Sequence, residues 1–334
     1  SLKSGITGGL TAGLGLALLI IFVIEFMDRT IKTGEEAEAR LGLPVLGVIP
    51  DMRVSSGRYG YYRNYGDSPK DRGRTSNQRD SPAQKKRAAE PATIEFVPLT
   101  QPRSSVSEAY RSLRTALLLS SAEDLITIAV SSAQPGEGKT STVVNLAIVM
   151  EQLGKRVLLI DADLRKPRIH KIFRVPNRDG LVSCLTRGED LETAIQPTQL
   201  PNLFVLPSGP VPPNPSELLA SERMRSLLKH ARDRFDSIIL DTPPILPVSD
   251  AVVIGAITDG TVICLQAGKV PRDEAVSARD RLGMGEVKIL GVVLNFYRPS
   301  GAGGRKRHYY YYQAYGEPGE SGEPEARVPA DSAA

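Results

Sequence analysis

The sequence has few cysteines, little excess of either charge and none of the motifs of several common enzyme classes. Only two of its 334 residues are cysteines, Cys184 and Cys264, and no CxxC pair occurs, which excludes a disulfide scaffold and a cysteine zinc site. The formal net charge is only +4, too small an excess to indicate nucleic acid as a partner. The absence of HRD, DFG and GxSxG motifs, and of histidines at metal-ligand spacing, excludes a eukaryotic-type kinase, a serine-hydrolase elbow and a histidine metal centre.

Near the N-terminus, residues 6–26 form an apolar run long enough to cross a ~30 Å hydrocarbon core as one helix. Arg29 and Lys32 follow this run, and Lys3 alone precedes it, which places the C-terminal bulk on the cytoplasmic side of the cell membrane. A signal peptide is the alternative, but its apolar stretch is usually only ~7–15 residues long. The sequence has no initiator Met, so we expect a fragment of a longer protein, with residues 1–5 ending an external portion.

Composition divides the rest of the chain. A juxtamembrane segment, residues 27–50, contains a short amphipathic stretch and a strand-like LPVLGVIP. Residues 51–93 are basic and poor in aliphatic side chains, and residues 299–334 are rich in Gly, Pro and Glu, so we expect a disordered linker and a disordered tail. The folded domain is therefore predicted to be residues 94–298.

Within this domain, short β-branched apolar runs alternate with helical stretches. Such runs are typical of strands buried on both faces, and the alternation predicts an α/β fold with a mostly parallel sheet and helices on both faces. The expected strands are 125–132, 156–163, 203–208, 237–244, 261–267 and 288–296, and the expected helices are 140–154, 215–234, 249–257 and 271–283. Ligands of such folds bind at the carboxyl ends of the strands.

The motif AQPGEGKTS, residues 133–141, lies between the first of these strands and a helix, which is the arrangement of a nucleotide phosphate loop. Lys139 can reach the β- and γ-phosphates, and the Thr140 hydroxyl can ligate Mg²⁺. Ala133 replaces the usual first glycine, which is tolerable if its φ is negative. The predicted nucleotide-binding residues are Gly136, Glu137, Gly138, Lys139, Thr140 and Ser141.

Three aspartates lie at the carboxyl ends of two of the predicted strands. Asp161 and Asp163 end the VLLI strand, and Asp241 ends the SIIL strand. All three are expected at the edge of the sheet where the phosphate loop opens. Phosphoryl transfer needs one carboxylate to hold Mg²⁺ and another to orient or deprotonate the attacking group. A helix cap or turn is the alternative role for any single one of them.

These motifs in combination resemble one family. A predicted span followed by LPVLGVIP, EAYRSLR, GEGKT, LLIDADLRKP, IILDTPP and a C-terminal tyrosine cluster is similar to the bacterial tyrosine autokinases, or BY-kinases, of exopolysaccharide and capsule assembly. The span resembles that of a polysaccharide co-polymerase. The resemblance implies a P-loop NTPase-like fold that binds ATP and Mg²⁺, with Lys139, Asp161, Asp163 and Asp241 as catalytic residues. It further implies that Thr140, Asp161 and Asp241 hold the metal and that Asp163 lies near the acceptor hydroxyl.

Related nucleotide-binding folds also suggest that Asn295, at the end of GVVLN, contacts the adenine. Nine of the eleven tyrosines lie in the predicted linker and tail, where aromatic residues are usually scarce. Phosphate acceptance explains this placement, since a kinase needs a hydroxyl on flexible backbone. The resemblance assigns the acceptor role to Tyr309, Tyr310, Tyr311, Tyr312 and Tyr315.

The EAYRSLR segment is predicted to be a helix on which Glu108, Arg111 and Arg114 share one face. Ser105 and Glu108 could form a capping box at its start. Such a column is usually only a solvated face, but the resemblance gives this ExxRxxR pattern a role in subunit contacts.

The overall prediction is a membrane-anchored autokinase that works in a homo-oligomeric ring, phosphorylates tails in trans and regulates polysaccharide polymerisation and export. The implied partners are the polysaccharide machinery and a cognate tyrosine phosphatase. One alternative is an ATPase switch of the partition and division-site type, although Gln134 stands where that group carries a lysine. The other alternative is a non-enzymatic scaffold that sets polysaccharide chain length.

Overall fold

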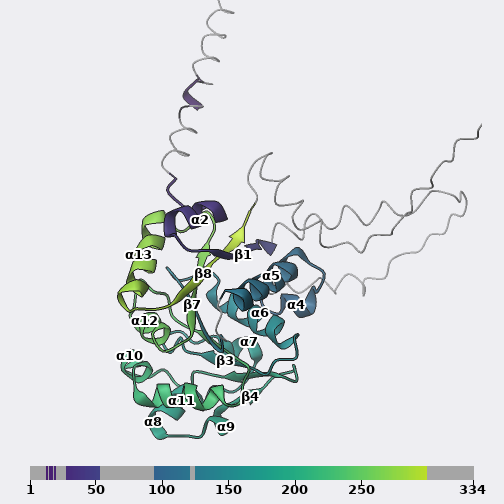
Figure 1. The fold of residues 1–334 in the computed structure, drawn as a ribbon, viewed down its shortest axis with the longest axis vertical. Coiled ribbons are helices and arrows are strands. Elements are labelled where there is room, and N and C mark those ends of the chain that lie inside the picture. The colour runs from purple at the N-terminus through teal and green to yellow at the C-terminus, as the bar shows by residue number, and fades with distance from the viewer. Residues whose placement is uncertain are drawn as a thin grey trace, which may run out of the picture. The chain divides into compact units, whose positions relative to one another are not determined.

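A single eight-stranded sheet organises the described part of the chain (Figure 1). The computed structural model describes residues 28–52, 94–120 and 125–298, and the helical positions 13, 15–17 and 19. The strand order is β1-β8-β7-β2-β6-β3-β5-β4, and every neighbouring pair is parallel except β4 and β5. The strands are β1 (Val45–Pro50), β2 (Thr127–Ser132), β3 (Val157–Asp161), β4 (Gln196–Pro197), β5 (Leu203–Leu206), β6 (Ser237–Asp241), β7 (Gly260–Gln266) and β8 (Ile289–Tyr297).

The central strands are buried on both faces, as their composition predicts. Every residue of β2, β3 and β6 is buried. Alternate residues enter opposite cores, so Ile128 and Val130 pack into one cluster while Ala129 packs into another. The prediction of a mostly parallel sheet covered by helices on both faces is therefore confirmed, and each of the six predicted strands is present with ends that differ by a few residues.

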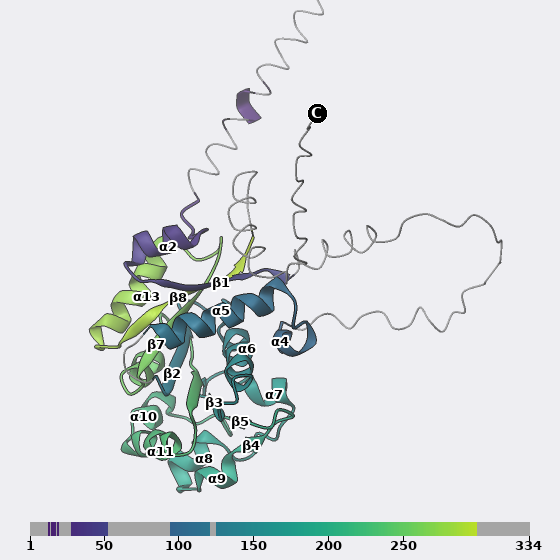
Figure 2. The ribbon, with the colours of Figure 1, turned by 45° about the vertical axis from the view of Figure 1, so that its right-hand side comes forward.

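A different set of helices packs on each face of the sheet (Figures 1 and 2). One core contains residues of α4 to α7, and the two cores of the opposite face contain residues of α2 and α8 to α13. The helices are α2 (Gly34–Leu41), α4 (Val97–Thr100), α5 (Ser105–Leu119), α6 (Lys139–Glu151), α7 (Ile169–Phe173), α8 (Leu181–Arg187), α9 (Leu191–Ala194), α10 (Pro215–Leu219), α11 (Glu222–Arg232), α12 (Asp250–Gly255) and α13 (Arg272–Met284).

Two helix starts differ from the sequence predictions. The predicted helix 215–234 is two helices, because the Ser221 side chain accepts a hydrogen bond from the Met224 amide and starts α11 separately from α10. The predicted capping box at Ser105 is wrong. Ser104 is the N-cap of α5, and its side chain accepts from the Ser107 amide, which leaves Ser105 inside the first turn.

The segment before the predicted linker joins the same sheet. Strand β1 pairs in parallel with β8, Thr30 forms a bridge with Pro271, and Glu36 pairs with Arg272 of α13. At the end of β1, the Arg298 guanidinium donates to Asp51 at 2.7 Å. Residues 28–51, which composition alone sets apart from residues 94–298, are thus part of the folded core.

Other predicted parts fall outside the described residues. These are residues 299–334 with the tyrosine cluster, residues 53–93 of the linker, and most of the predicted span 6–26. Within the described portion, no helix combines the length and the apolar character needed to cross a bilayer.

Candidate active site

The phosphate loop connects β2 to α6 and is shaped by two glycines. Gly136 and Gly138 have φ values of +88° and +87°, a region that L side chains rarely adopt. Ala133 is not among the described residues with positive φ, which meets the condition for replacing the usual first glycine. Gly138 is the N-cap of α6, so the unpaired amides of the first turn surround the loop and favour an anion there.

Lys139, the first residue of α6, brings the predicted carboxylates together. Its Nζ lies 2.9 Å from Asp163 Oδ2 and 3.3 Å from Asp241 Oδ1. The Thr140 hydroxyl donates to Asp241 Oδ2 at 2.7 Å. Burial alone would lower the pKa of Lys139, but the charges of Asp241 and Asp163 outweigh burial and raise it. The lysine is therefore held as a cation among carboxylates.

Asp161 stands beside Asp241 because β3 and β6 are neighbours and the two aspartates are in register. Asp161 Oδ2 accepts from the amides of Arg168 and Ile169 at 3.1 and 3.0 Å. Its other oxygen, Oδ1, is buried and has no hydrogen-bond partner among the described residues. Burial, with the nearby charge of Asp241, raises the pKa of Asp161 to about 7.

These oxygens suit a hard divalent cation. Mg²⁺ prefers oxygen ligands and is usually held by one or two carboxylates together with phosphates and water. Asp161 Oδ1 is buried and makes no hydrogen bond with the described residues, so it could bind the ion. The Asp241 carboxylate and the Thr140 hydroxyl are in contact and could supply further oxygen ligands. No group of three or more His, Cys, Asp or Glu side chains capable of holding a metal by themselves occurs in the described ranges. The residues therefore fit a magnesium ion that the substrate phosphates help to bind.

Two predicted nucleotide-binding residues, Glu137 and Asn295, form side-chain hydrogen bonds with the backbone of the phosphate loop. Glu137 is buried, and its Oε2 accepts from the Ala133 amide at 2.9 Å, which ties the middle of the loop to its start. Burial raises the pKa of Glu137 to about 8. Asn295, only 3% exposed, donates from its amide to the Glu137 carbonyl at 3.2 Å. Both side chains contact the backbone of the loop, and the adenine contact of Asn295 stays a prediction.

Ser141 and Asn145, on the first two turns of α6, form hydrogen bonds with residues 94–97. The Ser141 hydroxyl donates to Glu95 at 3.3 Å. Asn145 accepts from the Val97 amide at 3.0 Å and donates to the Ile94 carbonyl at 2.9 Å. Residues 94–97 are thereby fixed against α6. No local signal identifies these contacts, because the partners are more than forty residues apart.

The three predicted subunit-contact residues, Glu108, Arg111 and Arg114, all lie on α5. Arg111 pairs with Glu108 and also donates to the Pro102 carbonyl at 2.9 Å. Arg114 instead donates to the Val149 carbonyl of α6 at 2.7 Å. Arg114 therefore already links two helices within one chain, and an intersubunit role for the column stays a prediction.

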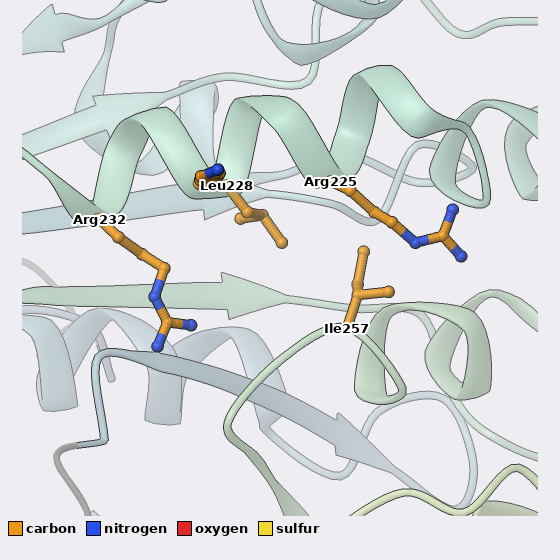
Figure 3. Close-up of a pocket in the computed structure, with 5 residues that line it drawn as sticks. Arg225, Leu228, Arg232 and Ile257 are labelled. Atoms are coloured by element: carbon orange, nitrogen blue, oxygen red, sulfur yellow. The ribbon is translucent and has the colours of Figure 1, made fainter.

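A cavity of about 280 Å³ lies elsewhere (Figure 3). It is lined by Arg225, Leu228, Lys229, Arg232 and Ile257. Arg232 donates to Thr127, the first residue of β2, so this cavity is near the amino ends of the strands. It contains none of the predicted site residues. The chemistry-bearing side chains gather at the opposite, carboxyl edge of the sheet.

Comparisons with known proteins agree with this geometry. Residues 125–272 match a family model described as an AAA domain. Tyrosine-protein kinase YwqD of Bacillus subtilis (strain 168) is 44% identical over 200 residues, which cover 60% of this chain and 84% of the relative. Tyrosine-protein kinase ptk of Acinetobacter johnsonii is 32% identical over 291 residues, 86% of this chain but 36% of the relative. Among solved structures, the kinase domain of Escherichia coli tyrosine kinase ETK has a TM-score of 0.66 and 33% identity, and the match covers 81% of this chain and 97% of that one.

Proposed function

The chain belongs to the bacterial tyrosine-protein kinase family and is therefore a protein-tyrosine kinase, and from that premise we propose that it transfers the γ-phosphoryl group of ATP to tyrosines in the tail of a neighbouring copy. The acceptors are Tyr309 to Tyr312 and Tyr315. The names of the relatives favour this function over an ATPase switch.

The observation that carries the proposal is the convergence of two carboxylates on Lys139: Asp241 ends β6, and Asp163 follows the neighbouring strand β3 by two residues. The phosphate loop and Lys139 would hold the β- and γ-phosphates, and Thr140, Asp161 and Asp241 would hold Mg²⁺. Mg²⁺ would neutralise charge that develops on the phosphate oxygens. The tyrosine oxygen attacks the γ-phosphorus, the bond to the β–γ bridging oxygen breaks, and the phenolic proton passes to Asp163. ADP and a phosphotyrosine are the products.

Transfer in trans agrees with the length of the tail. Tyr309 lies fourteen residues after Asn295 in the last strand, and a chain of that length extends to at most ~46 Å. A neighbouring subunit is within that reach. Contacts through Glu108, Arg111 and Arg114 would place one tail at the next site in a ring. Each phosphorylation adds about −1.5 to −2 charges, which oppose re-entry into a cleft lined by carboxylates, so exhaustive phosphorylation should dissociate the ring.

The setting of this reaction follows from the N-terminal sequence. We propose a single span at residues 6–26 that anchors the chain in the cell membrane, with the catalytic domain on the cytoplasmic side. The phosphorylation state would govern polymerisation and export of a surface polysaccharide, and a cognate phosphatase would reset it. A scaffolding role in chain-length control is compatible with this activity.

A mixing experiment tests the trans reaction. One copy of residues 1–334 carries Phe at the five tail tyrosines, and the other carries Lys139→Met with its tail intact. Each chain alone should gain no tail phosphate, whereas the mixture with Mg·ATP should phosphorylate the Lys139→Met tail. Lys229→Met, which removes an exposed lysine on α11, is the control and should behave like the parent. If the parent phosphorylates its tail but the mixture contains no tail phosphate, transfer occurs within one chain.

A further inference from the structure

Arg165 makes a forked ion pair with a fully buried carboxylate. Its Nε lies 2.8 Å from Asp250 Oδ2, and its Nη2 lies 3.0 Å from Asp250 Oδ1. The Asp250 side chain is 0% exposed, whereas that of Arg165 is 40% exposed. Two parallel N–H···O bonds to one carboxylate require the planar fork of arginine, which lysine does not have.

This pair joins the loop after β3 to the starts of two helices at the carboxyl edge of the sheet. Arg165 lies between β3 and α7, and Asp250 is the first residue of α12, after β6. Ser216, near the start of α10, accepts from Arg165 Nη2 at 3.1 Å and donates to Asp250. Hydrogen bonding to Arg165 and Ser216 outweighs burial and lowers the pKa of Asp250, so this carboxylate is ionised and fully engaged.

The same loop orients Asp161, which ends β3, and Asp163, which follows it. The Lys166 amide donates to Asp163 Oδ1 at 3.0 Å, and the amides of Arg168 and Ile169 donate to Asp161 Oδ2. Arg165 immediately precedes this run of donors, two residues after Asp163 and next to Lys166. Its side chain attaches the loop to α10 and α12, while the backbone amides that follow it hold the carboxylates.

We propose that Arg165 is a positioning residue: its anchor to Asp250 and Ser216 holds the loop 163–169 so that Asp163 and Asp161 keep the orientation at Lys139 that transfer to tyrosine requires. The proposal rests on the kinase function above and deepens it. Arg165 acts through the loop and is not assigned a contact with substrate.

Arg165→Lys is the main test because it keeps the charge and removes the fork. Displacing reacting groups by about 1 Å costs up to roughly 100-fold in rate, so we expect kcat for tail phosphorylation to fall about 10- to 100-fold with the KM for ATP little changed. Asp250→Asn should give the same pattern, and the double variant should be no worse than the more impaired single variant, since the two residues act as a unit. The matched control is Arg187→Lys, which alters a surface pair with Asp179.

Hydrogen exchange of the full chain supplies a readout that needs no activity. The amides of Lys166, Arg168 and Ile169 should exchange about tenfold faster or more in Arg165→Lys, while amides of the central strand β2 keep their protection. Unchanged exchange, or a KM for ATP that rises as much as kcat falls, would overturn the positioning role. If the parent phosphorylates no tyrosine but the exchange pattern holds, the proposed function fails and the anchor stands. If the parent is active and Arg165→Lys changes neither kcat nor exchange, the anchor fails alone.

Discussion

Gly138→Ala should damage the phosphate loop far more than a chemically identical change at Gly154. Both glycines have positive φ, +87° and +81°, so an alanine at either position meets the same backbone penalty. A Cβ at Gly154 would have no heavy atom within 4 Å. At Gly138 it would lie 2.1 Å from Asn295 Nδ2 and 2.9 Å from a ring carbon of Phe296. The difference between the two variants therefore isolates the contact between the loop and β8.

The expected losses follow from these contacts. Left-handed backbone costs an alanine about 1–2 kcal/mol, partly offset by a less flexible unfolded chain, so Gly154→Ala should lose about 1 kcal/mol of unfolding free energy. Gly138→Ala must also displace Asn295, which breaks its hydrogen bonds to Glu137 and Thr142 at about 1 kcal/mol each. With a further ~1 kcal/mol of overpacking against Phe296, the total is about 4 kcal/mol.

Urea unfolding and ATP titration of both variants measure these effects. Gly154→Ala should bind ATP like the parent. Gly138→Ala should bind it at least about tenfold more weakly, since 1.4 kcal/mol of loop distortion is enough for that change. Equal stability losses in the two variants, or parental ATP affinity in Gly138→Ala, would refute the idea that Asn295 and Phe296 hold the loop in its binding shape.

Other perturbations give independent checks. Glu137 has a pKa raised to about 8, so near pH 7 the folded chain retains a proton that the unfolded chain has lost. Between pH 7 and 8 this group should lower the parent's unfolding free energy by about 1 kcal/mol. Urea titrations of Glu137→Gln should show a slope that is smaller by this amount, and an unchanged slope would contradict the assignment. Asp161→Asn removes a buried carboxylate whose pKa is about 7 and which is therefore charged at pH 8. Without Mg²⁺, the melting temperature of this variant at pH 8 should be higher than that of the parent, and added Mg²⁺ should raise it by less. An equal rise with Mg²⁺ in both proteins would contradict the assignment of Asp161 as a metal ligand. Deleting residues 28–52 as well as 1–27 uncovers β8 and α13, so a chain lacking residues 1–52 should be less stable and less soluble than one lacking only residues 1–27. A peptide of residues 28–52 should restore part of the loss, and equal stability of the two truncated chains would contradict the pairing.

The strands and the main site residues could be predicted because they follow from local patterns and one topological rule. Unbroken β-branched runs such as VLLI predict strands buried on both faces, and Asp161 and Asp241 are in register because each ends such a strand. Parallel strands place their carboxyl ends at one edge, which brings these aspartates to Lys139 without any knowledge of distant contacts.

The parts that could not be predicted depend on distant partners. Arg165 lies in the quoted LLIDADLRKP motif, but its partner Asp250 is 85 residues away and no pattern links them. Related nucleotide-binding folds suggest an adenine contact for Asn295, but no pattern shows that its side-chain amide also donates to the Glu137 carbonyl in the loop. Strand β1 has an apolar sequence pattern, but only the structure shows that it pairs with β8.

The central claim is that Lys139 and its carboxylates phosphorylate the tail tyrosines, and mass spectrometric mapping of phosphotyrosine tests it most directly. The full chain is purified in detergent, incubated with Mg·ATP and compared with Lys139→Met. The account predicts phosphate on Tyr309 to Tyr312 and Tyr315 of the parent and none on the variant. ATP hydrolysis by the parent with no tyrosine modified would contradict it and favour an ATPase switch.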